Sequence, residues 1–444
     1  MSFSANLLKA RSHIAFVLGL SLAASFALSV ESRVNLDHYR SNGYVAIRPD
    51  PQPLPLVSPR RLRSDDLNNA RIAWGYFEQN YQPATGLVNS AGGFPSTTIW
   101  DQGSYLLGMI SAERIGIIDR REFDRRMEQV LETLAGLPLF DSRLPNKVYD
   151  TRTLEMTDYS NTPAVHGIGW SALDVARMTV PLNILLYDYP EHSAQAARIL
   201  TNWDFAALLK DGVLFGSRLA EGSNSVELVQ EGRLGYEEYA ARAIGLLGLD
   251  AMVAAKYDDF LRFETIGGQS IAIDSRSFTD FDAHNFVVSE PYILTAIEFG
   301  LDTEARELAQ RVFLAQFDRY NDTGQLTAVS EDNIDQEPYF IYNSVFANGV
   351  AWNALAEDGS THNEKRTVST KAAFGWDALY ATDYTDRLMR HVAITATGAG
   401  FYSGVYEADN RINAVATANT NGIILETIQY KLNGPLLTAR FRKR

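Results

Sequence analysis

Two kinds of helical segment alternate along this chain of 444 residues, and the alternation limits the folds open to it. The first kind is amphipathic: 64–81, 119–136 and the segment from Thr303 place apolar residues at steps of three and four. The second kind is apolar or small on nearly every side, as in the segments from Thr97 and Ala164. A helix without a polar face is buried on most sides.

About twelve helices in which buried and amphipathic segments follow one another predict an all-α fold, an (α/α)6 toroid with an inner ring of helices inside an outer ring. Their expected starts lie near residues 64, 98, 119, 164, 191, 235, 290, 302, 343, 369, 384 and 420. The Gly-rich, β-branched stretch 212–232 predicts a short inserted hairpin. No polar linker divides the chain, so we expect one domain over 64–444; two separate helical domains are the alternative.

The first 63 residues differ from the rest. A basic start at residues 9–13 precedes an apolar run, 14–28, that ends on small residues. This pattern predicts a signal peptide over 1–29 and a periplasmic or secreted protein. The run is shorter than the ~20 residues of a comfortable membrane span, and an uncleaved signal anchor is the alternative. No later segment reaches that length without a charge, so we expect no other membrane contact. The segment 30–63, with its Pro cluster, predicts an extended tether or strap.

Composition excludes several classes of function. The net charge of −14, with no basic cluster except the terminal RFRKR, argues against a nucleic-acid partner. The chain has no Cys, which excludes thiol catalysis and zinc–thiolate sites. It lacks an HExxH motif, a glycine-rich phosphate loop and a G-x-S-x-G elbow, so we expect no metal and no cofactor. Acids, aromatics, Asn and Gln remain, and they suit a saccharide partner whose glycosidic bond is cleaved by two carboxylates.

Asp101 is the first candidate catalytic residue, in the stretch TTIWDQGS. A carboxylate in the first turn of a helix is held ionised by the helix dipole, which suits a base that activates water. Trp100 beside it offers a stacking surface for a sugar ring. The alternative is structural, because Thr98 followed by Asp101 also resembles a capping box.

Glu231 is the second candidate, at an expected strand-to-helix turn in QEGRLGYEEYA. Arg233 could orient a carboxylate or a substrate hydroxyl; alternatively, the two residues form a surface salt bridge. Glu290 is the third, after the apolar residues 286–288, whose surroundings would raise its pKa as a general acid requires. Its alternative is a helix cap before Pro291. For Glu331, which precedes Asp332, we expect a solvated charge.

Other residues are expected to line the same funnel and bind the substrate. They are aromatic or charged and lie near expected helix starts or in late aromatic–acid pairs: Trp100, Arg233, Tyr236, Tyr292, Trp376 and Glu407.

Several stretches carry a resemblance to a known family: TTIWDQGS, LPNKVYDTRTL, QEGRLGYEEYAA, SEPY, LTAVSE, STKAAFGWDALY and NTNGIILE. Over nearly all of Ser64 to Leu432 the chain resembles a family of exported or membrane-attached bacterial proteins catalogued as a domain of unknown function. The layout of that family is similar to the glucoamylase-like toroids that include β-1,2-glucan hydrolases. This analogy implies, by position at helix starts, that Asp101, Glu231 and Glu290 carry the catalysis.

The leading hypothesis is therefore periplasmic hydrolysis of a glucan or exopolysaccharide, with Glu290 or Glu231 as acid and Asp101 as base. The first alternative is a non-catalytic glycan-binding or polysaccharide-secretion accessory protein on the same scaffold. The second is a sugar epimerase, for which His166 and His284 are the candidates.

Overall fold

The computed structural model describes residues 47–220, 222–231, 234–256, 260–281 and 284–438. The expected signal peptide and the first part of the expected strap lie outside these residues. Among the described residues, no helix has the length and hydropathy to cross a membrane.

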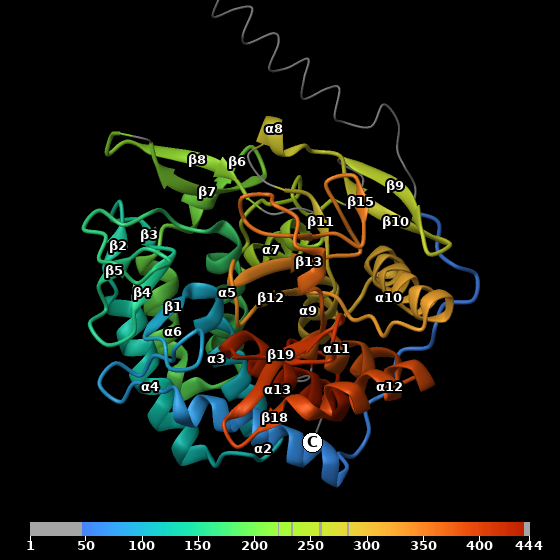
Figure 1. Ribbon diagram of the computed structural model, residues 1–444. Coiled ribbons are helices and arrows are strands. Elements are labelled where there is room, and N and C mark those ends of the chain that lie inside the picture. Colours follow the sequence, from blue (N-terminus) through green and yellow to red (C-terminus); the bar gives the residue numbers. More distant parts are fainter. Residues whose placement is uncertain (1–46, 221, 232–233, 257–259, 282–283, 439–444) are drawn as a thin grey trace, which may run out of the picture.

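Six helices surround the centre of the molecule (Figure 1). Each contacts the next, and the last contacts the first, so their contacts close into a ring. In ring order these inner helices are α3 (Ile99–Arg114), α5 (Ala172–Asp188), α7 (Tyr236–Gly245), α9 (Glu290–Leu294), α11 (Thr370–Tyr380) and α13 (Ala418–Asn433). The two predicted inner helices that begin near Thr98 and Gly235 are therefore members of one ring.

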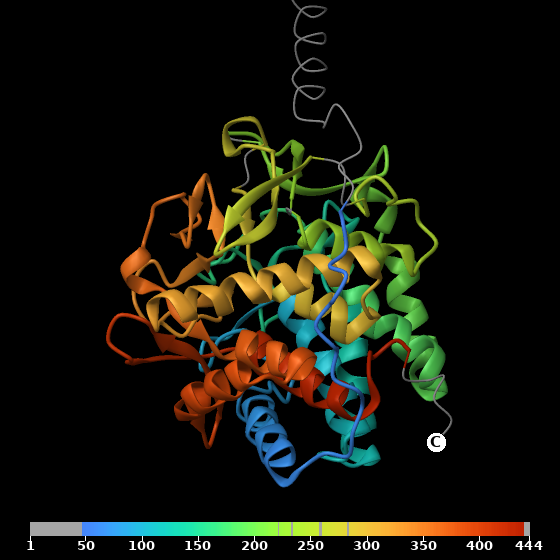
Figure 2. The same cartoon turned by 90° about the vertical axis from the view of Figure 1, so that its right-hand side faces the viewer.

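Outer helices pack against this ring, and Figure 2 shows α10 and α12 side by side. They are α2 (Ser64–Gln79), α4 (Arg120–Gly136), α6 (Pro190–Asn202), α10 (Thr303–Thr323) and α12 (Asp383–Val392). Between α7 and α9 there is no long outer helix among the described residues: the hairpin of β9 (Leu261–Ile266) and β10 (Gln269–Asp274) packs against α10 instead. The short helix α8 (Phe278–Phe281) follows that hairpin.

Short antiparallel sheets are the main departure from the expected all-α class, which needs correction to a mostly helical fold with many strands. The expected hairpin is present as β7 (Val213–Leu219) and β8 (Val226–Gln230), extended by β6 (Leu209–Lys210). The helix expected near 343 is wrong, because that region forms strands β13 and β14. The remaining strands are β1 (Ser96–Thr98), β2 (Leu139–Phe140), β3 (Leu144–Pro145), β4 (Val148–Asp150), β5 (Met156–Thr157), β11 (Phe286–Val287), β12 (Glu331–Asn333), β13 (Phe340–Asn343), β14 (Phe346–Ala347), β15 (Val350–Ala351), β16 (Ala354–Leu355), β17 (Thr367–Ser369), β18 (Ala396–Thr397), β19 (Gly400–Tyr406) and β20 (Ile412–Ala416).

These strands have a positional meaning. β1, β11, β17 and β20 come directly before α3, α9, α11 and α13, and β8 comes before α7. The sheets therefore gather where the inner helices begin, and the first turns of those helices carry the side chains of the candidate site.

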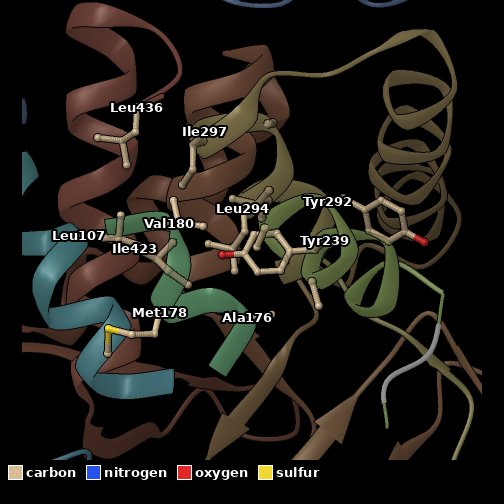
Figure 3. Close-up of a cluster of buried hydrophobic side chains, with 14 of the residues drawn as sticks. Leu107, Ala176, Met178, Val180, Tyr239, Tyr292, Leu294, Ile297, Ile423 and Leu436 are labelled. Atoms are coloured by element: carbon tan, nitrogen blue, oxygen red, sulfur yellow. The ribbon is translucent and has the colours of Figure 1, made fainter. Parts of the chain in front are cut away.

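The inner helices are buried because they approach each other closely and share one apolar core. A Cβ at Gly108 of α3 would lie 3.4 Å from the Cα of Gly422 in α13, so small residues allow this contact. Figure 3 shows side chains from α3, α5, α7, α9 and α13 meeting in the core, among them Leu107, Ala176, Met178, Val180, Tyr239, Tyr292, Leu294 and Ile423. This accounts for the lack of a polar face in the sequence of these helices.

The described part of the expected strap, 47–63, contains no helix or strand. It crosses the outer surface beside α10 (Figure 2) and is held through its backbone. The N–H of Leu54 donates to Gln310 of α10, that of Val57 to the carbonyl of Leu379, and that of Arg60 to the carbonyl of Lys431.

Candidate active site at the first turns of the inner helices

The first turn of α3 presents Asp101 as the sequence predicts, and also confirms the structural alternative. The backbone N–H of Asp101 donates to the Thr98 hydroxyl at 3.1 Å, and that hydroxyl donates to Oδ2 of Asp101 at 2.8 Å. Burial raises the pKa of Asp101 above its ordinary value, although hydrogen bonds from Ser90 and Thr98 oppose the shift. Desolvation is the largest influence on the pKa of Asp101, and it acts against the stabilisation of the carboxylate that the helix dipole provides.

Trp100 is partly exposed and rigidly held. Its ring lies over the guanidinium of Arg177, 4.7 Å away, and edge-on to Tyr236 with ring centroids 5.7 Å apart. Its indole N–H donates to Oδ1 of Asn419, at the start of α13, across 3.2 Å. Trp100 and Tyr236, both expected at the site, are thus brought together.

Glu290 is buried and paired. Lys371 of α11 lies 2.5 Å from its carboxylate, and Asn419 donates to both of its oxygens at 3.0 Å. The same Asn419 accepts from Trp100, so Glu290 fixes the amide that orients the indole. Both carboxylate oxygens of Glu290 are therefore engaged within the protein, by Lys371 and by Asn419.

Glu231 lies at the predicted strand-to-helix turn, between β8 and α7. Its Oε2 accepts from the backbone N–H of Ala172, the first residue of α5, at 2.6 Å, and Lys147 lies 3.3 Å from its Oε1. A Cβ added at Gly216 of β7 would come closer than 3.0 Å to this carboxyl group, so Gly216 is needed to make room for it. Arg233, the expected partner, lies outside the described residues.

Asp174 is the functional candidate that the sequence reasoning missed. In the first turn of α5, its Oδ1 accepts from Ser171 at 2.9 Å and its Oδ2 from the backbone N–H of Trp100 at 3.3 Å. Burial, followed by the negative charge of Glu231, raises the pKa of Asp174 to about 7. The available signal was the pattern Ser171-x-x-Asp174, which matches Thr98-x-x-Asp101.

Glu331 is buried, so the expectation of a solvated charge at this position is wrong, and Asp332 beside it is buried as well. Burial raises the pKa of each to about 7, and the nearby positive charge of Lys371 opposes the shift in both. Lys371 lies 3.7 Å from Asp332 and also pairs with Glu290, so one ammonium serves several buried acids.

Three expected substrate contacts lie elsewhere. Tyr292 is buried in the core (Figure 3). Trp376 has 0% exposure, packs against Phe313 and donates to Ser289, so it offers no stacking surface. Glu407 is paired with Arg319 and Arg366. Trp376 is thus held in the core by apolar packing, and Glu407 is held by two ion pairs with arginines.

The two histidines considered for an epimerase differ in setting. His166 is exposed in a loop, and His284 stacks on Phe278 at 4.2 Å and hydrogen-bonds Asn348. Neither is hydrogen-bonded to Asp101, Asp174 or Glu231 in the described chain. Within those same residues, no three His, Asp or Glu side chains are arranged to hold a metal ion.

Solved structures with a similar fold were found across nearly the whole chain. A candidate glucoamylase from Bacteroides caccae has a TM-score of 0.62 at 14% identity, over 86% of this chain and 96% of that one. The endo-β-1,2-glucanase of Chitinophaga pinensis, in complex with sophorotriose and glucose, has a TM-score of 0.59 at 13% identity, over 86% and 96%. The endo-β-1,2-glucanase of Talaromyces funiculosus, in complex with sophorose, has a TM-score of 0.57 at 12% identity, over 82% and 84%. At such identities the likeness concerns the fold.

A comparison with curated proteins found no match. The family described as "Protein of unknown function (DUF3131)" matches residues 68–434, which confirms the resemblance seen in the sequence. The chain therefore belongs to the DUF3131 family.

Proposed function

We propose that this protein is an exported glycoside hydrolase that cleaves a glucan with Asp174 as general acid and Glu231 as the partner carboxylate. The observation that carries the proposal is that two acids in different environments lie at the start of one helix: Asp174 has a pKa raised by burial, whereas Glu231 contacts a backbone N–H and an ammonium group. Asp174 and the residue that binds Glu231, Ala172, both belong to the first turn of α5. Two neighbouring carboxyl groups in different environments are what acid–base cleavage of a glycosidic bond requires.

Asp174 suits the acid. With a pKa of about 7 it carries a proton in a large fraction of molecules at neutral pH. The charges of Glu231 and Asp101 both disfavour its ionised form, which gives Asp101 a supporting role in place of the one expected from sequence. In cleavage, Asp174 gives its proton to the glycosidic oxygen as the bond from that oxygen to the anomeric carbon breaks.

Glu231 suits the partner. Its carboxyl group is held in place by the backbone N–H of Ala172 and by the ammonium group of Lys147. A charged carboxylate either takes a proton from the attacking water, with inversion, or attacks the anomeric carbon itself, with retention. Glu290 and Asn419 then act as positioning residues, because they hold the indole of Trp100.

The substrate class and the setting complete the proposal. Trp100 is a partly exposed stacking surface beside the acids, which suits a sugar ring. The similar folds include enzymes described as endo-β-1,2-glucanases, which supports a glucan as first choice. The ring of inner and outer helices supports the finer assignment as an (α/α)6 toroid, with β9 and β10 in place of one outer helix. The apolar run 14–28 supports export to the periplasm.

A non-catalytic glycan-binding protein is the second candidate, favoured by the extent to which Glu290 and Lys371 are buried and paired. The two candidates separate in an assay of reducing-end release from linear neutral glucans. The hydrolase account expects turnover by the parent protein and its loss in Asp174→Asn, whereas Glu132→Gln, an exposed change on α4, keeps it. Binding of glucans without turnover by the parent protein would favour the binding protein.

A further inference from the structure

A second group of aromatic rings lies near the proposed catalytic acids. Phe286 of β11 and Tyr342 of β13 are stacked, with ring centroids 4.3 Å apart and planes 22° apart. Phe340 packs edge-on against Tyr342 at 5.2 Å. All three rings are partly exposed, although each is fixed by its neighbour. Such a fixed and accessible ring pair is a surface on which a sugar can stack without ordering a mobile side chain.

This pair is continuous with Trp100. Phe286 lies edge-on to Tyr236 at 6.4 Å, and Tyr236 lies edge-on to Trp100 at 5.7 Å. The rings therefore form a row with Trp100 at one end and Tyr342 at the other.

The Trp100 end of the row lies beside Asp174. The backbone of Trp100 donates to Asp174, and the charges of Glu231 and Asp174 are among those that raise the pKa of Tyr342 after burial has done so. Glu331 acts on Tyr342 in the same way and is its cross-strand partner in the β12–β13 register. Within the part of the chain that the structure describes, no residue accepts a hydrogen bond from the Tyr342 hydroxyl, which leaves it available to a ligand.

The ionisable groups around the row are mostly acidic. Asp101, Asp174, Glu231 and Glu331 lie near it, whereas the nearby ammonium groups of Lys147 and Lys371 are paired with Glu231 and Glu290. A uronate, sulfate or phosphate on a sugar would lie among these carboxyl groups while the ammonium groups of Lys147 and Lys371 are already paired, and the net charge of −14 adds to the repulsion.

We propose that the stacked pair of Phe286 and Tyr342 is a second sugar subsite, and that the chain bound between it and Trp100 is an uncharged glucan and not an acidic exopolysaccharide. The inference rests on the proposed function, since it assigns the substrate class of the same site. Stacking on Tyr342 holds one sugar unit, stacking on Trp100 holds another, and the bond that is cleaved lies near Asp174.

The test is calorimetric binding in the Asp174→Asn background, where hydrolysis does not consume the ligand. The probes are linear β-1,2-, β-1,3- and β-1,4-gluco-oligosaccharides and a carboxymethylated form of each. Tyr342→Ala is expected to weaken binding of the neutral probe that binds best by about 3- to 10-fold, as loss of an aromatic contact does. Tyr342→Phe keeps the ring and should stay within about 3-fold. Tyr187→Ala, an exposed change in the last turn of α5, is the matched control.

The carboxymethylated form should bind at least ~10-fold more weakly at low salt, with the gap narrowing as salt rises. Equal affinity in the parent background and in Tyr342→Ala would overturn the subsite and leave the proposed function standing. Stronger binding or cleavage of the acidic form would overturn the substrate class alone. If the Asp174→Asn protein bound no probe and the parent protein cleaved none, the proposed function would fall together with the inference.

Discussion

The backbone N–H of Trp100 donates a hydrogen bond to Oδ2 of Asp174, with the two atoms 3.3 Å apart. The residue that offers the stacking surface and the acid proposed to protonate the substrate are therefore fixed to one another, although they belong to different helices. Because helix starts converge at the site, backbone groups in the first turn of one inner helix can orient side chains on the next. A small movement of α3 against α5 would thus change the proton donor as well as the stacking surface.

The pH dependence of kcat/KM should report Asp174. Its protonated form is the active one, and with a pKa of about 7 the rate falls tenfold for each pH unit well above 7. In Asp174→Asn the rate should be lower by ~10²–10⁴ and this alkaline decline should be absent. Initial rates of reducing-end release between pH 5 and 9 measure both. An alkaline decline that is unchanged in the Asn variant would remove Asp174 from the role of acid.

Stability should fall as the pH rises through 7. Asp174, Glu331 and Asp332 have ordinary pKa values of 3.8 or 4.5 and folded values of about 7. A raised pKa means that the folded state holds the proton more tightly, so its contribution is complete below pH ~4 and is lost as the pH passes 7. Asp66 and Asp150 have lowered pKa values and act only on the acid side of that window.

Thermal unfolding at pH 5.5 and pH 8 tests this contribution. The melting temperature should be lower at pH 8, and Asp332→Asn, which keeps a neutral side chain of the same shape, should shrink the difference. Glu132→Gln, on the exposed face of α4, should leave the difference unchanged. A parent protein that is more stable at pH 8 would show that the three acids are ionised in the folded state.

Arg177 should be essential for stability. It is fully buried, lies 2.8 Å from Glu298 and 3.1 Å from Glu426, and hydrogen-bonds Tyr239. Arg177→Met would leave two buried carboxyl groups without their cation. Removing one partner of a buried ion pair lowers the free energy of unfolding by about 3–5 kcal/mol. Denaturant unfolding measures the loss. Arg198→Met, which breaks an exposed pair with Glu132, should change the free energy of unfolding by only ~0–1 kcal/mol.

Gly216 should be required for activity more than for folding. A Cβ there would collide with the carboxyl group of Glu231, so Gly216→Ala must displace this acid. We expect the rate to fall by ~10²-fold or more, since proton transfer depends on position, while the protein remains folded. Gly398→Ala is the control because no atom lies within 4 Å of its added Cβ. Full activity of Gly216→Ala would show that Glu231 need not occupy its observed position.

The sequence predicted the parts of the site that depend on local patterns. Thr98 and Asp101 form the expected capping arrangement, and Glu231 lies at the expected turn between a strand and a helix. Asp174 was missed because the buried helix was expected to begin at 164, whereas it begins at Ala172. That shift turns a position inside a helix into a first turn that faces the site.

The rest depended on contacts between distant segments. Glu331 was expected to be solvated because an acid follows it in the sequence, and the ammonium group of Lys371, which comes from a distant segment, helps to make its burial tolerable. Trp376 lies beside an acid in the sequence, which suggested a place at the site. In the structure its ring instead packs against Phe313 of α10, a contact that the sequence of α11 does not reveal. The strands near 343 are too short for their alternation of side chains to stand out from helical periodicity.

The most direct test of the account compares turnover and binding in one substitution, Glu231→Gln, which keeps the shape of the side chain and removes its charge. Reducing-end release from the best neutral glucan and the dissociation constant for an oligomer of that glucan are measured for the parent protein and the variant. The account predicts a rate lower by ~10²–10⁴ with an affinity that changes only a few-fold, because an amide still hydrogen-bonds a sugar hydroxyl. Equal turnover in the two proteins would contradict the assignment of Glu231, and binding without turnover in the parent protein would contradict the hydrolase itself.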